Sequence, residues 1–301
     1  WTWMDEGLNT FLEHETIRTR YEDFDATSGT PRGIVPFMKG DKSIMRPIMG
    51  QSDNQASSFG PNGYTKPSAA LVLLRETIMG PEIFDKAFKE YSERWAFKHP
   101  KPADFFRTME DASGTDLDWF WRGWFYTTDN VDLTLADVKW FQVKEEQMDP
   151  EKKNVTVKQG DLTANTTTNN ANDFSGGPQP LTVENTSEDT YRDFRSRIND
   201  KAVRATLQGK NLYELKLQNS GGLVSPILIE WTYKDGSKEL ETIPAEIWRL
   251  NESEVTKVFV KDKEVTNIVI DPNRETADVN TSDNVFPKKA ESKFDQFRKG
   301  N

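Results

Sequence analysis

Apolar residues recur at helical spacing through most of the first 130 residues. After Gly80 they fall at i, i+3, i+4, i+7 and i+11, which is one face of a packed helix: Phe84, Ala87, Phe88, Tyr91 and Trp95. The apolar run before it, from Ala69 to Met79, has Pro67 near its first turn and stops at Gly80. Both residues favour those positions, so the spacing predicts two consecutive helices.

Two shorter helices complete this helical part. The first is centred on Phe105 and Met109, and the second buries Trp121 and Phe125, with Asp116 as its N-cap. The opening stretch, WTWMDEGLNTFLEHE, has the spacing of an amphipathic helix as well. Residues 20–63 show little periodicity and contain several Gly and Pro, which predicts long ordered loops.

The period changes to two after Asp129. Residues 131–146 favour a strand, and from residue 211 onward Tyr213, Leu215 and Leu217 alternate with charged neighbours. Asp235-Gly236 lies between two alternating runs, which is a hairpin signal. Several short strands separated by turns in this way predict a small β-sandwich.

The region between these strands is different in composition. Residues 147–186 are poor in large apolar side chains and include LTANTTTNNANDFSGGPQP, a stretch that buries too little to offset its ordering entropy. We expect a flexible, Asn/Thr-rich insertion over about 147–206 that ends in a short basic helix at 188–206. The predicted organisation is a helical unit over 1–130, a β-sandwich domain over 131–286 and a charged tail over 287–301.

Composition narrows the classes of function. A net charge of −10 argues against a nucleic-acid surface or a polybasic membrane patch. No run approaches the ~18 apolar residues that cross a bilayer. Cysteine is absent, which excludes disulfides, thiolate metal sites and cysteine nucleophiles. His14 and His99 are the only histidines, so a zinc site built wholly from this chain would rely on carboxylates, a poor ligand set for zinc.

Three segments carry the candidate chemistry: WMDEGLNTFLEHE, NGYTKPSAALVLLRETIMGPEIF and DLDWFWRGWFY. Together they resemble the C-terminal part of the catalytic domain of the aminopeptidase N family, the gluzincin zinc metallopeptidases. In that family an H-E-x-x-H helix precedes an Asn-Glu-Gly or Asp-Glu-Gly segment, and MDEG resembles the latter. YTKP matches a family Tyr-x-Lys-Gly except that Pro67 replaces the glycine, which a helix start accepts. The resemblance implies an α+β multidomain fold, in which the helical half of a thermolysin-like catalytic lobe precedes the β-sandwich.

The resemblance also assigns site residues. Glu6 takes the position of the zinc-ligand glutamate, and Tyr64 that of the tyrosine that donates a hydrogen bond to the developing oxyanion. Glu13 matches a recurrent family glutamate, and we expect it to orient a ligand. Taken singly, Glu6 would be a solvated helix acid and Tyr64 a turn or core tyrosine. Because MDEG, YTKP and the aromatic helix after them occur together, we favour the metal-ligand role for Glu6 and the oxyanion role for Tyr64.

The two histidine ligands and the general-base glutamate of the resembled family would lie upstream of Trp1. The chain opens in the middle of a helical pattern, so we expect a fragment of a longer protein. His14 does not replace a missing ligand, because eight residues place it roughly 80° around the helix from Glu6; His99 lies in a Lys/Pro-rich turn. Both are interpreted as structural or exposed.

The predicted function is therefore part of a zinc-dependent aminopeptidase that hydrolyses N-terminal residues from peptides and is inactive without its N-terminal part. An alternative is a non-catalytic interaction module, or a degenerate relative, whose β-sandwich binds a partner or an envelope polymer. A third is a hydrolase acting on a different amide. The sequence upstream of Trp1 would distinguish these hypotheses: an H-E-x-x-H segment there indicates an enzyme, and its absence indicates an interaction module or a degenerate relative. The acidic, Asn/Thr-rich, Cys-free composition resembles exported family members, which implies the periplasm or cell envelope of a bacterium.

Overall fold

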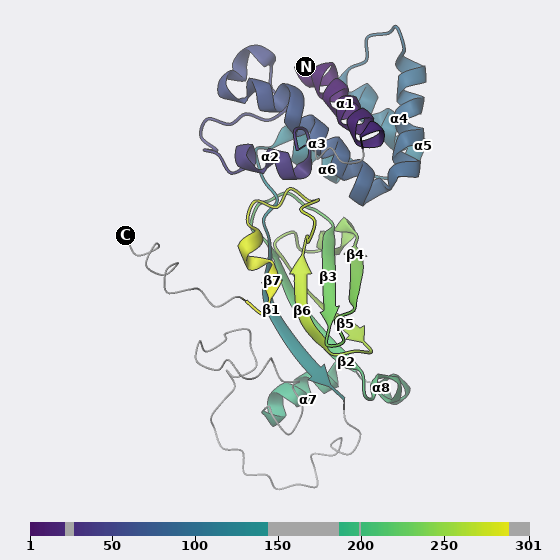
Figure 1. The fold of residues 1–301 in the computed structure, drawn as a ribbon, viewed down its shortest axis with the longest axis vertical. Helices are drawn as coiled ribbons and strands as arrows, with labels where there is room; N and C mark the ends of the chain where they lie inside the picture. The colour runs from purple at the N-terminus through teal and green to yellow at the C-terminus, as the bar shows by residue number, and fades with distance from the viewer. Residues whose placement is uncertain (22–26, 144–186, 199, 289–301) are drawn as a thin grey trace, which may run out of the picture.

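The computed structural model of the protein describes residues 1–21, 27–143, 187–198 and 200–288. Figure 1 shows most helices gathered at one end of the molecule and the strands at the other. The helical part contains α1 (Glu6–Arg20), α2 (Pro31–Met38), α3 (Lys66–Leu73), α4 (Pro81–Trp95), α5 (Pro102–Ser113) and α6 (Asp118–Tyr126). Short 3₁₀ turns lie before α1 and between α2 and α3.

An aromatic cluster supports the start of α1. Trp3 is 1% exposed, and its ring stacks on Phe106 with 5.8 Å between centroids. Phe105 and Phe125 contact the same indole at 5.8 Å and 4.8 Å, and Trp121 stacks on Phe106 at 4.6 Å. Each aromatic side chain buries roughly 150–250 Å². The cluster therefore ties the residues before α1 to α5 and α6.

The helix that contains α3 is wider than an α-helix at both ends. Pro61–Thr65 and Leu74–Met79 are π-helical and continue directly into α3. Pro67 accounts for the first of these segments, because a proline inside a helix donates no N–H and its ring collides with the carbonyl four residues earlier. The helix thus begins before the predicted first turn at Pro67, and it ends as predicted at Gly80, whose φ is +81°.

The prediction of loops alone over residues 20–63 is wrong, because this stretch contains α2. Thr30 caps that helix: its Oγ1 accepts a hydrogen bond from the backbone N–H of Gly33 at 3.0 Å. Pro31 occupies the first turn, where its missing N–H costs nothing. With only eight residues and an internal Pro36, α2 is too short to show a clear apolar period.

Asp116 is not the N-cap of α6, contrary to prediction. Leu117 takes that position, and the Asp116 carboxylate instead accepts a hydrogen bond from the backbone N–H of Asp118 at 3.2 Å. The Asp116 carboxylate thus still pairs with a free backbone N–H at the helix start, but Asp116 lies one residue before the N-cap instead of at it. The inward-facing side of α6 is as predicted, since Trp121 and Phe125 are buried.

Two antiparallel sheets form the strand part. Their orders are β1–β2–β5 and β4–β3–β6–β7. The strands are β1 (Leu133–Gln142), β2 (Asn211–Asn219), β3 (Ile227–Tyr233), β4 (Lys238–Ile243), β5 (Glu254–Lys261), β6 (Val265–Ile270) and β7 (Val285–Phe286). The predicted hairpin at Asp235-Gly236 joins β3 to β4, and Gly236 has a φ of +80°. The α+β architecture, helices followed by antiparallel sheets, is confirmed.

Side chains from both sheets meet in the strand core. Trp231 of β3 is fully buried, and its ring lies 6.1 Å from Tyr213 on β2 and 5.0 Å from Phe259 on β5. The Tyr213 hydroxyl accepts a hydrogen bond from the backbone N–H of Val265 at 2.7 Å. That bond joins β2 to the start of β6, so it fixes one sheet against the other.

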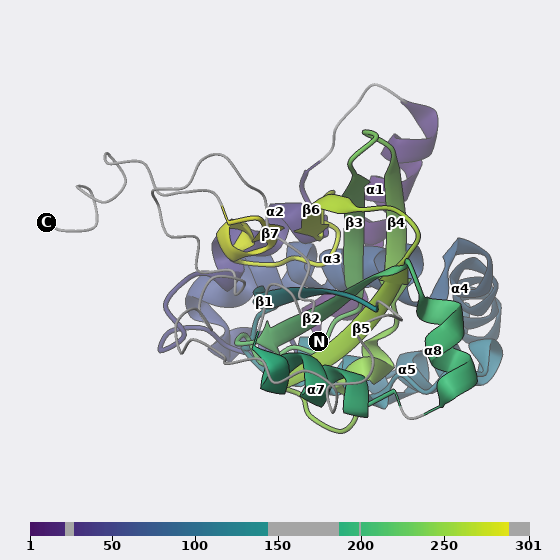
Figure 2. The ribbon, with the colours of Figure 1, turned by 90° about the horizontal axis from the view of Figure 1, so that it is seen from below.

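Two helices occupy the described end of the predicted insertion. They are α7 (Glu188–Ser196) and α8 (Lys201–Leu207), in place of one basic helix over 188–206. Phe194 of α7 stacks on Phe141 of β1 with 3.8 Å between ring centroids, so this part packs on the sheet. In Figure 1, α7 and α8 lie at the end of the sheets farthest from the other helices, and in Figure 2 this end faces the viewer. The expected flexibility of 147–186 and nearly all of the charged tail fall outside the described residues.

One hydrophobic core runs through the helical and strand parts. It extends from Trp3 and Phe125 among the helices to Val131, Leu223 and Phe286 among the strands. The predicted boundary near residue 130 falls in the connection between α6 and β1, and the division into domains stays a prediction. Among the described helices, none combines the length and the apolar character that crossing a membrane requires.

Replacing Phe97 with glycine should stabilise the protein. Phe97 has a φ of +60° after Ala96 (φ −52°, ψ 131°), and the N–H of Lys98 donates to the Trp95 carbonyl at 3.0 Å. This is a type II turn, whose third residue favours glycine. Because the Phe97 side chain is fully exposed, glycine removes strain without losing packing. We expect a gain of up to about 1 kcal/mol in the free energy of unfolding by urea.

The matched control is Gly114→Ala, at the left-handed residue after α5, where φ is +69° and open space surrounds the glycine. This variant should lose about 1 kcal/mol. A less stable Phe97→Gly protein would show that the phenylalanine side chain makes a stabilising contact.

Candidate functional site

The helix that carries Tyr64 crosses α1 at small residues. A Cβ placed on Gly7 would lie 2.6 Å from Cγ of Pro67 and 3.3 Å from the carbonyl oxygen of Gly63. Real Cβ atoms do not approach heavy atoms that closely, so only glycine fits at position 7. Gly63 in turn packs against Thr2, with 3.1 Å from its own hypothetical Cβ to the threonine methyl carbon. The crossing explains a helical glycine that propensity alone disfavours.

This close crossing brings Glu6 next to Tyr64. Glu6 is the first residue of α1, Tyr64 lies in the π-helical segment, and both side chains are half-buried. A side-chain hydrogen bond with the Glu6 carboxylate is the main cause that raises the pKa of the Tyr64 phenol, followed by burial and by the charges of Glu6 and Asp5. The neighbouring carboxylate favours the protonated phenol, so Tyr64 keeps its proton at neutral pH. Two residues assigned from separate motifs are therefore neighbours, and their chemical roles stay predictions.

Glu13 lies on the same side of α1 as Glu6, because seven residues make almost two helical turns. Its side chain is exposed, and no hydrogen bond or ion pair holds it among the described residues. The structure therefore leaves its carboxylate accessible. Its proposed role in orienting a ligand stays a prediction.

Neither histidine joins Glu6 and Tyr64. His14 is 8% exposed on α1, and its Nε2 lies 3.9 Å from Oε1 of Glu15. Burial is the largest of the effects that lower the pKa of His14, so it is neutral at pH 7. His99 is exposed in the turn between α4 and α5. Among the described residues the site thus offers one suitable carboxylate, which fits one of the three protein ligands of a catalytic zinc.

Lys66, the lysine of the YTKP segment, is buried. It is 2% exposed, and its Nζ donates to the carbonyl oxygen of Thr127 at 3.5 Å. Burial lowers the pKa of Lys66 to about 8; attraction to Asp129 opposes this and repulsion by Lys42 adds to it. Sequence reasoning assigned Lys66 no role. A lysine is seldom fully buried without a close charge partner, but that signal needs the structure to be seen.

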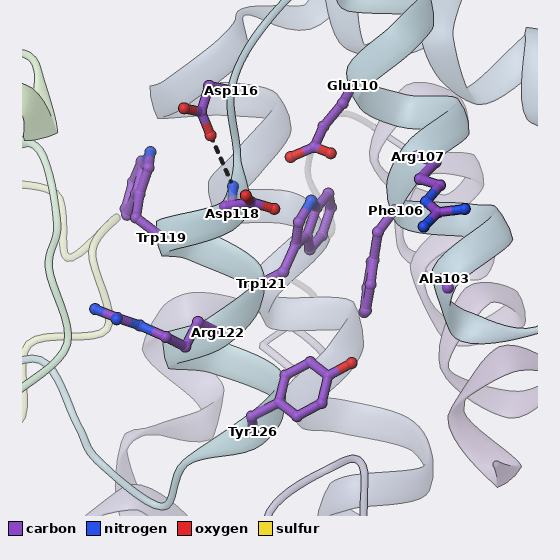
Figure 3. Close-up of a pocket in the computed structure, with 10 residues that line it drawn as sticks. All are labelled: Ala103, Phe106, Arg107, Glu110, Asp116, Asp118, Trp119, Trp121, Arg122 and Tyr126. Carbon is purple, nitrogen blue, oxygen red and sulfur yellow. Dashed lines mark hydrogen bonds between the residues drawn. The ribbon is translucent and has the colours of Figure 1, made fainter.

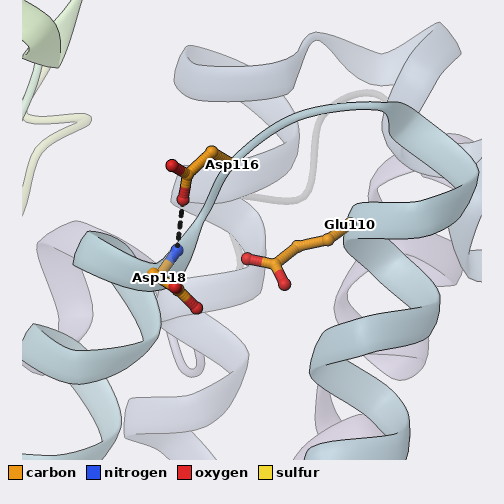
Figure 4. A group of neighbouring side chains, drawn as sticks. All are labelled: Glu110, Asp116 and Asp118. Carbon is orange, nitrogen blue, oxygen red and sulfur yellow. Dashed lines mark hydrogen bonds between the residues drawn. The ribbon is translucent and has the colours of Figure 1, made fainter.

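A groove of about 750 Å³ between α5 and α6 is a second feature that sequence reasoning missed. Figure 3 shows Phe106, Trp121 and Tyr126 along the groove and acidic side chains near one end. These acids are Glu110, Asp116 and Asp118, and one carboxylate oxygen from each lies within 4.8 Å of the other two (Figure 4). Burial is the main cause that raises the pKa of Glu110. Clusters of exposed acids are common without an ion, so we assign this one no role.

The Gly7→Ala variant should be less stable than the wild-type chain. The new methyl group would overlap the Pro67 ring, and the two helices would have to separate. We expect a loss of about 2 kcal/mol in the free energy of unfolding, measured by urea denaturation. Gly60→Ala is the control: Gly60 has helical φ and ψ and nothing within 4 Å of a Cβ. That control should be neutral or slightly more stable, and an equally destabilised control would refute the steric explanation.

Lys66 should make stability depend on alkaline pH. The pKa of Lys66 is about 8 in the folded protein and 10.5 ordinarily, so between these values the unfolded chain binds more protons. Stability from this residue therefore increases from pH 8 to pH 10.5, by about 3 kcal/mol in total. Urea unfolding of the wild type and Lys66→Met across this range should show that difference. Lys86→Met, at an exposed site on α4, should follow the wild-type profile.

Comparisons with known proteins bear on the helical part of the chain. The model of the peptidase family M1 domain matches residues 1–124. Human glutamyl aminopeptidase is 30% identical over 116 residues, which are 37% of this chain and 12% of that protein. Aminopeptidase N of Escherichia coli (strain K12) is 26% identical over 137 residues, 44% of this chain and 16% of that protein. The chain thus spans 12–16% of the length of these relatives.

Solved structures were also compared, and one of the matches covers almost the whole chain. The crystal structure of Legionella pneumophila aminopeptidase A in complex with aspartic acid aligns with a TM-score of 0.50 and 14% sequence identity. The alignment covers 98% of this chain and 24% of that one, and at this identity it speaks for the fold alone. The resemblance found in the sequence is confirmed by the family match and by the aminopeptidases among the relatives. Residues 1–124 thus match a peptidase family M1 domain, and aminopeptidase N is among the relatives of this chain.

Proposed function

We propose that this chain is part of a zinc-dependent aminopeptidase that hydrolyses N-terminal residues from peptides. The observation that carries the proposal is the pairing of Glu6 with Tyr64 beside the Gly7 crossing. A carboxylate and a protonated phenol from two motifs meet at one half-exposed place. The family match over residues 1–124 and the aminopeptidases among the relatives support this class of reaction.

Glu6 binds the metal in this proposal. Its carboxylate is half-exposed and pairs with no Lys, Arg or His among the described residues, so its oxygens remain available to a cation. Zinc, when bound, supplies a Lewis acid and a water whose pKa is lowered to about 7. Glu13, on the same side of α1, orients a neighbouring ligand through its free carboxylate.

Tyr64 stabilises the oxyanion in this proposal. Its raised pKa keeps the phenol protonated, which an oxyanion donor must be. The phenol beside Glu6 becomes available to a peptide carbonyl oxygen once Glu6 serves as a metal ligand. Both side chains lie on helices that pack closely at Gly7, which favours a fixed donor geometry.

The 301 residues by themselves should not turn over peptides. Their two histidines lie away from Glu6, so the imidazole ligands and the general base would come from another part of the full-length protein. Zinc held by a single carboxylate binds weakly and leaves no activated water in place. The missing segment of the same protein is therefore the proposed partner of this chain.

Zinc content and turnover of the full-length protein test the proposal. Glu6→Gln should lose bound zinc and, with it, activity. Tyr64→Phe should keep zinc and lower kcat on the order of 10²–10³-fold, because only a donor to the oxyanion is removed. Metal is measured by elemental analysis and turnover with glutamyl and alanyl 4-nitroanilides, since several relatives are named glutamyl aminopeptidases.

Two further variants sharpen this test. Glu13→Gln should weaken zinc binding by roughly 10–100-fold without abolishing it, as expected for a residue that orients a ligand. Glu93→Gln, on an exposed part of α4, should behave as wild type. A full-length protein without zinc, or Glu6 and Tyr64 variants that match wild type, would refute the aminopeptidase and favour the interaction module. Bound zinc with hydrolysis of another amide alone would indicate a different hydrolase.

A further inference from the structure

Lys66 is a buried charge with few partners. Its side chain is 2% exposed, and among the described residues its Nζ has one hydrogen bond, the 3.5 Å contact with the Thr127 carbonyl. Asp129 attracts the ammonium group, and Lys42 repels it. Desolvating an ammonium group costs several kcal/mol that one long hydrogen bond does not recover. A lysine at this position is therefore unfavourable for stability, which suggests that it serves another purpose.

Lys66 and Tyr64 point to opposite sides of their helix. Two residues correspond to about 200° at the α-helical angle and slightly less in a π-turn. Tyr64 and Pro67 face α1, as their contacts with Glu6 and Gly7 show. Gly63 packs on Thr2, which lies just before that helix. The ammonium group of Lys66 faces away from α1, toward the connection between α6 and β1. The first turns of the helix thus contact α1 on one side and, through Lys66, bond to Thr127 on the other.

The attachment on the Lys66 side is a helix C-terminus. Thr127 is the C-cap of α6, where free carbonyl groups and the helix dipole attract a cation. Thr127 is itself held, because its Oγ1 donates to the carbonyl of Gly123 at 2.8 Å and accepts from the N–H of Asp129 at 3.1 Å. Three residues after Thr127, the N–H of Asn130 donates to the carbonyl of Gly221 in the strand part at 3.1 Å. Lys66 therefore bonds to a fixed point shared by the helices and the sheets.

We propose that Lys66 is a positioning residue for Tyr64: by bonding to the C-terminus of α6 it sets the rotation of the π-helical segment and so holds the phenol toward Glu6. The inference rests on the proposed role of Tyr64 in catalysis. The wide π-turn needs such a restraint, because a helix start with a proline at position 67 lacks part of its regular hydrogen bonding. Without the ammonium group, the segment loses its hydrogen bond to α6. It keeps the contacts with α1 and the Asn62 Nδ2 hydrogen bonds to the Arg46 carbonyl and to Gln55 Oε1, both 2.6 Å.

A double-mutant cycle in the full-length protein tests this proposal. Lys66→Met should keep zinc and KM near wild-type values and lower kcat at least about tenfold, since small misplacements of a catalytic group are costly. In the Tyr64→Phe background the same change should have no further effect on kcat, because Lys66 acts through the phenol. Equal losses in both backgrounds would indicate a merely structural role and overturn the proposal. An unchanged kcat in Lys66→Met alone would overturn it too.

Further variants keep the outcome decisive. Lys66→Arg retains a charged N–H donor of at least equal reach, so it should recover part of the lost kcat. Lys66→Gln, one atom shorter than lysine, replaces Lys66→Met if that variant fails to fold. Lys261→Met removes a lysine that is 7% exposed and bonds Glu239 and Glu241 in the strand part. This control should lose stability but keep wild-type kcat per folded molecule. If Tyr64→Phe alone leaves kcat unchanged, the proposed function fails, whatever Lys66→Met does.

Discussion

The contact of Gly7 with Pro67 and Gly63 determines the geometry of the candidate site. Two helices approach until a single methyl group at Gly7 would not fit. The residue before the glycine, Glu6, is thereby placed beside the residue after Gly63, which is Tyr64. Both side chains are carried by helices rather than by loops. The Asp-Glu-Gly and Tyr-x-Lys-Pro segments are thus two halves of one packing contact as well as carriers of chemistry.

Aromatic packing holds this contact in place from behind. Trp3 fixes the entry to α1 against Phe106 and Phe125, so the helix start cannot move far without uncovering several rings. On the other side of the Tyr64 helix, the C-terminus of α6 receives Lys66. Glu6 and Tyr64 therefore lie between the aromatic cluster around Trp3 and the C-terminus of α6. Functional groups are positioned most precisely on ordered elements of this kind.

Much of this was predictable from the sequence, for reasons that particular residues make clear. Long apolar periods with strong end signals, such as the helix ended by Gly80 and the hairpin at Asp235-Gly236, were read correctly because local chemistry determines them. The eight-residue α2 was missed because its apolar pattern is too short to show a helical period. Its clearest signal is the Thr30 cap, which the periodicity does not include. Glu6 and Tyr64 were found through motifs, and their proximity required the structure. Burial of Lys66 and the grouping of Glu110 with Asp118 depend on tertiary packing, which spacing does not reveal.

The single core shared by helices and strands has a consequence for how the molecule unfolds. The Leu223 side chain reaches to within 3.0 Å of where a Cβ on Gly123 would be, and the Asn130 side chain donates to the carbonyl of Met38 at 3.3 Å. Contacts of this kind make the junction part of the interior. Separating the two parts would expose apolar surface on both, at about 25 cal/mol per Å². Loosening of the sheets is thus transmitted to the helices, and the two parts lose their structure as one cooperative unit.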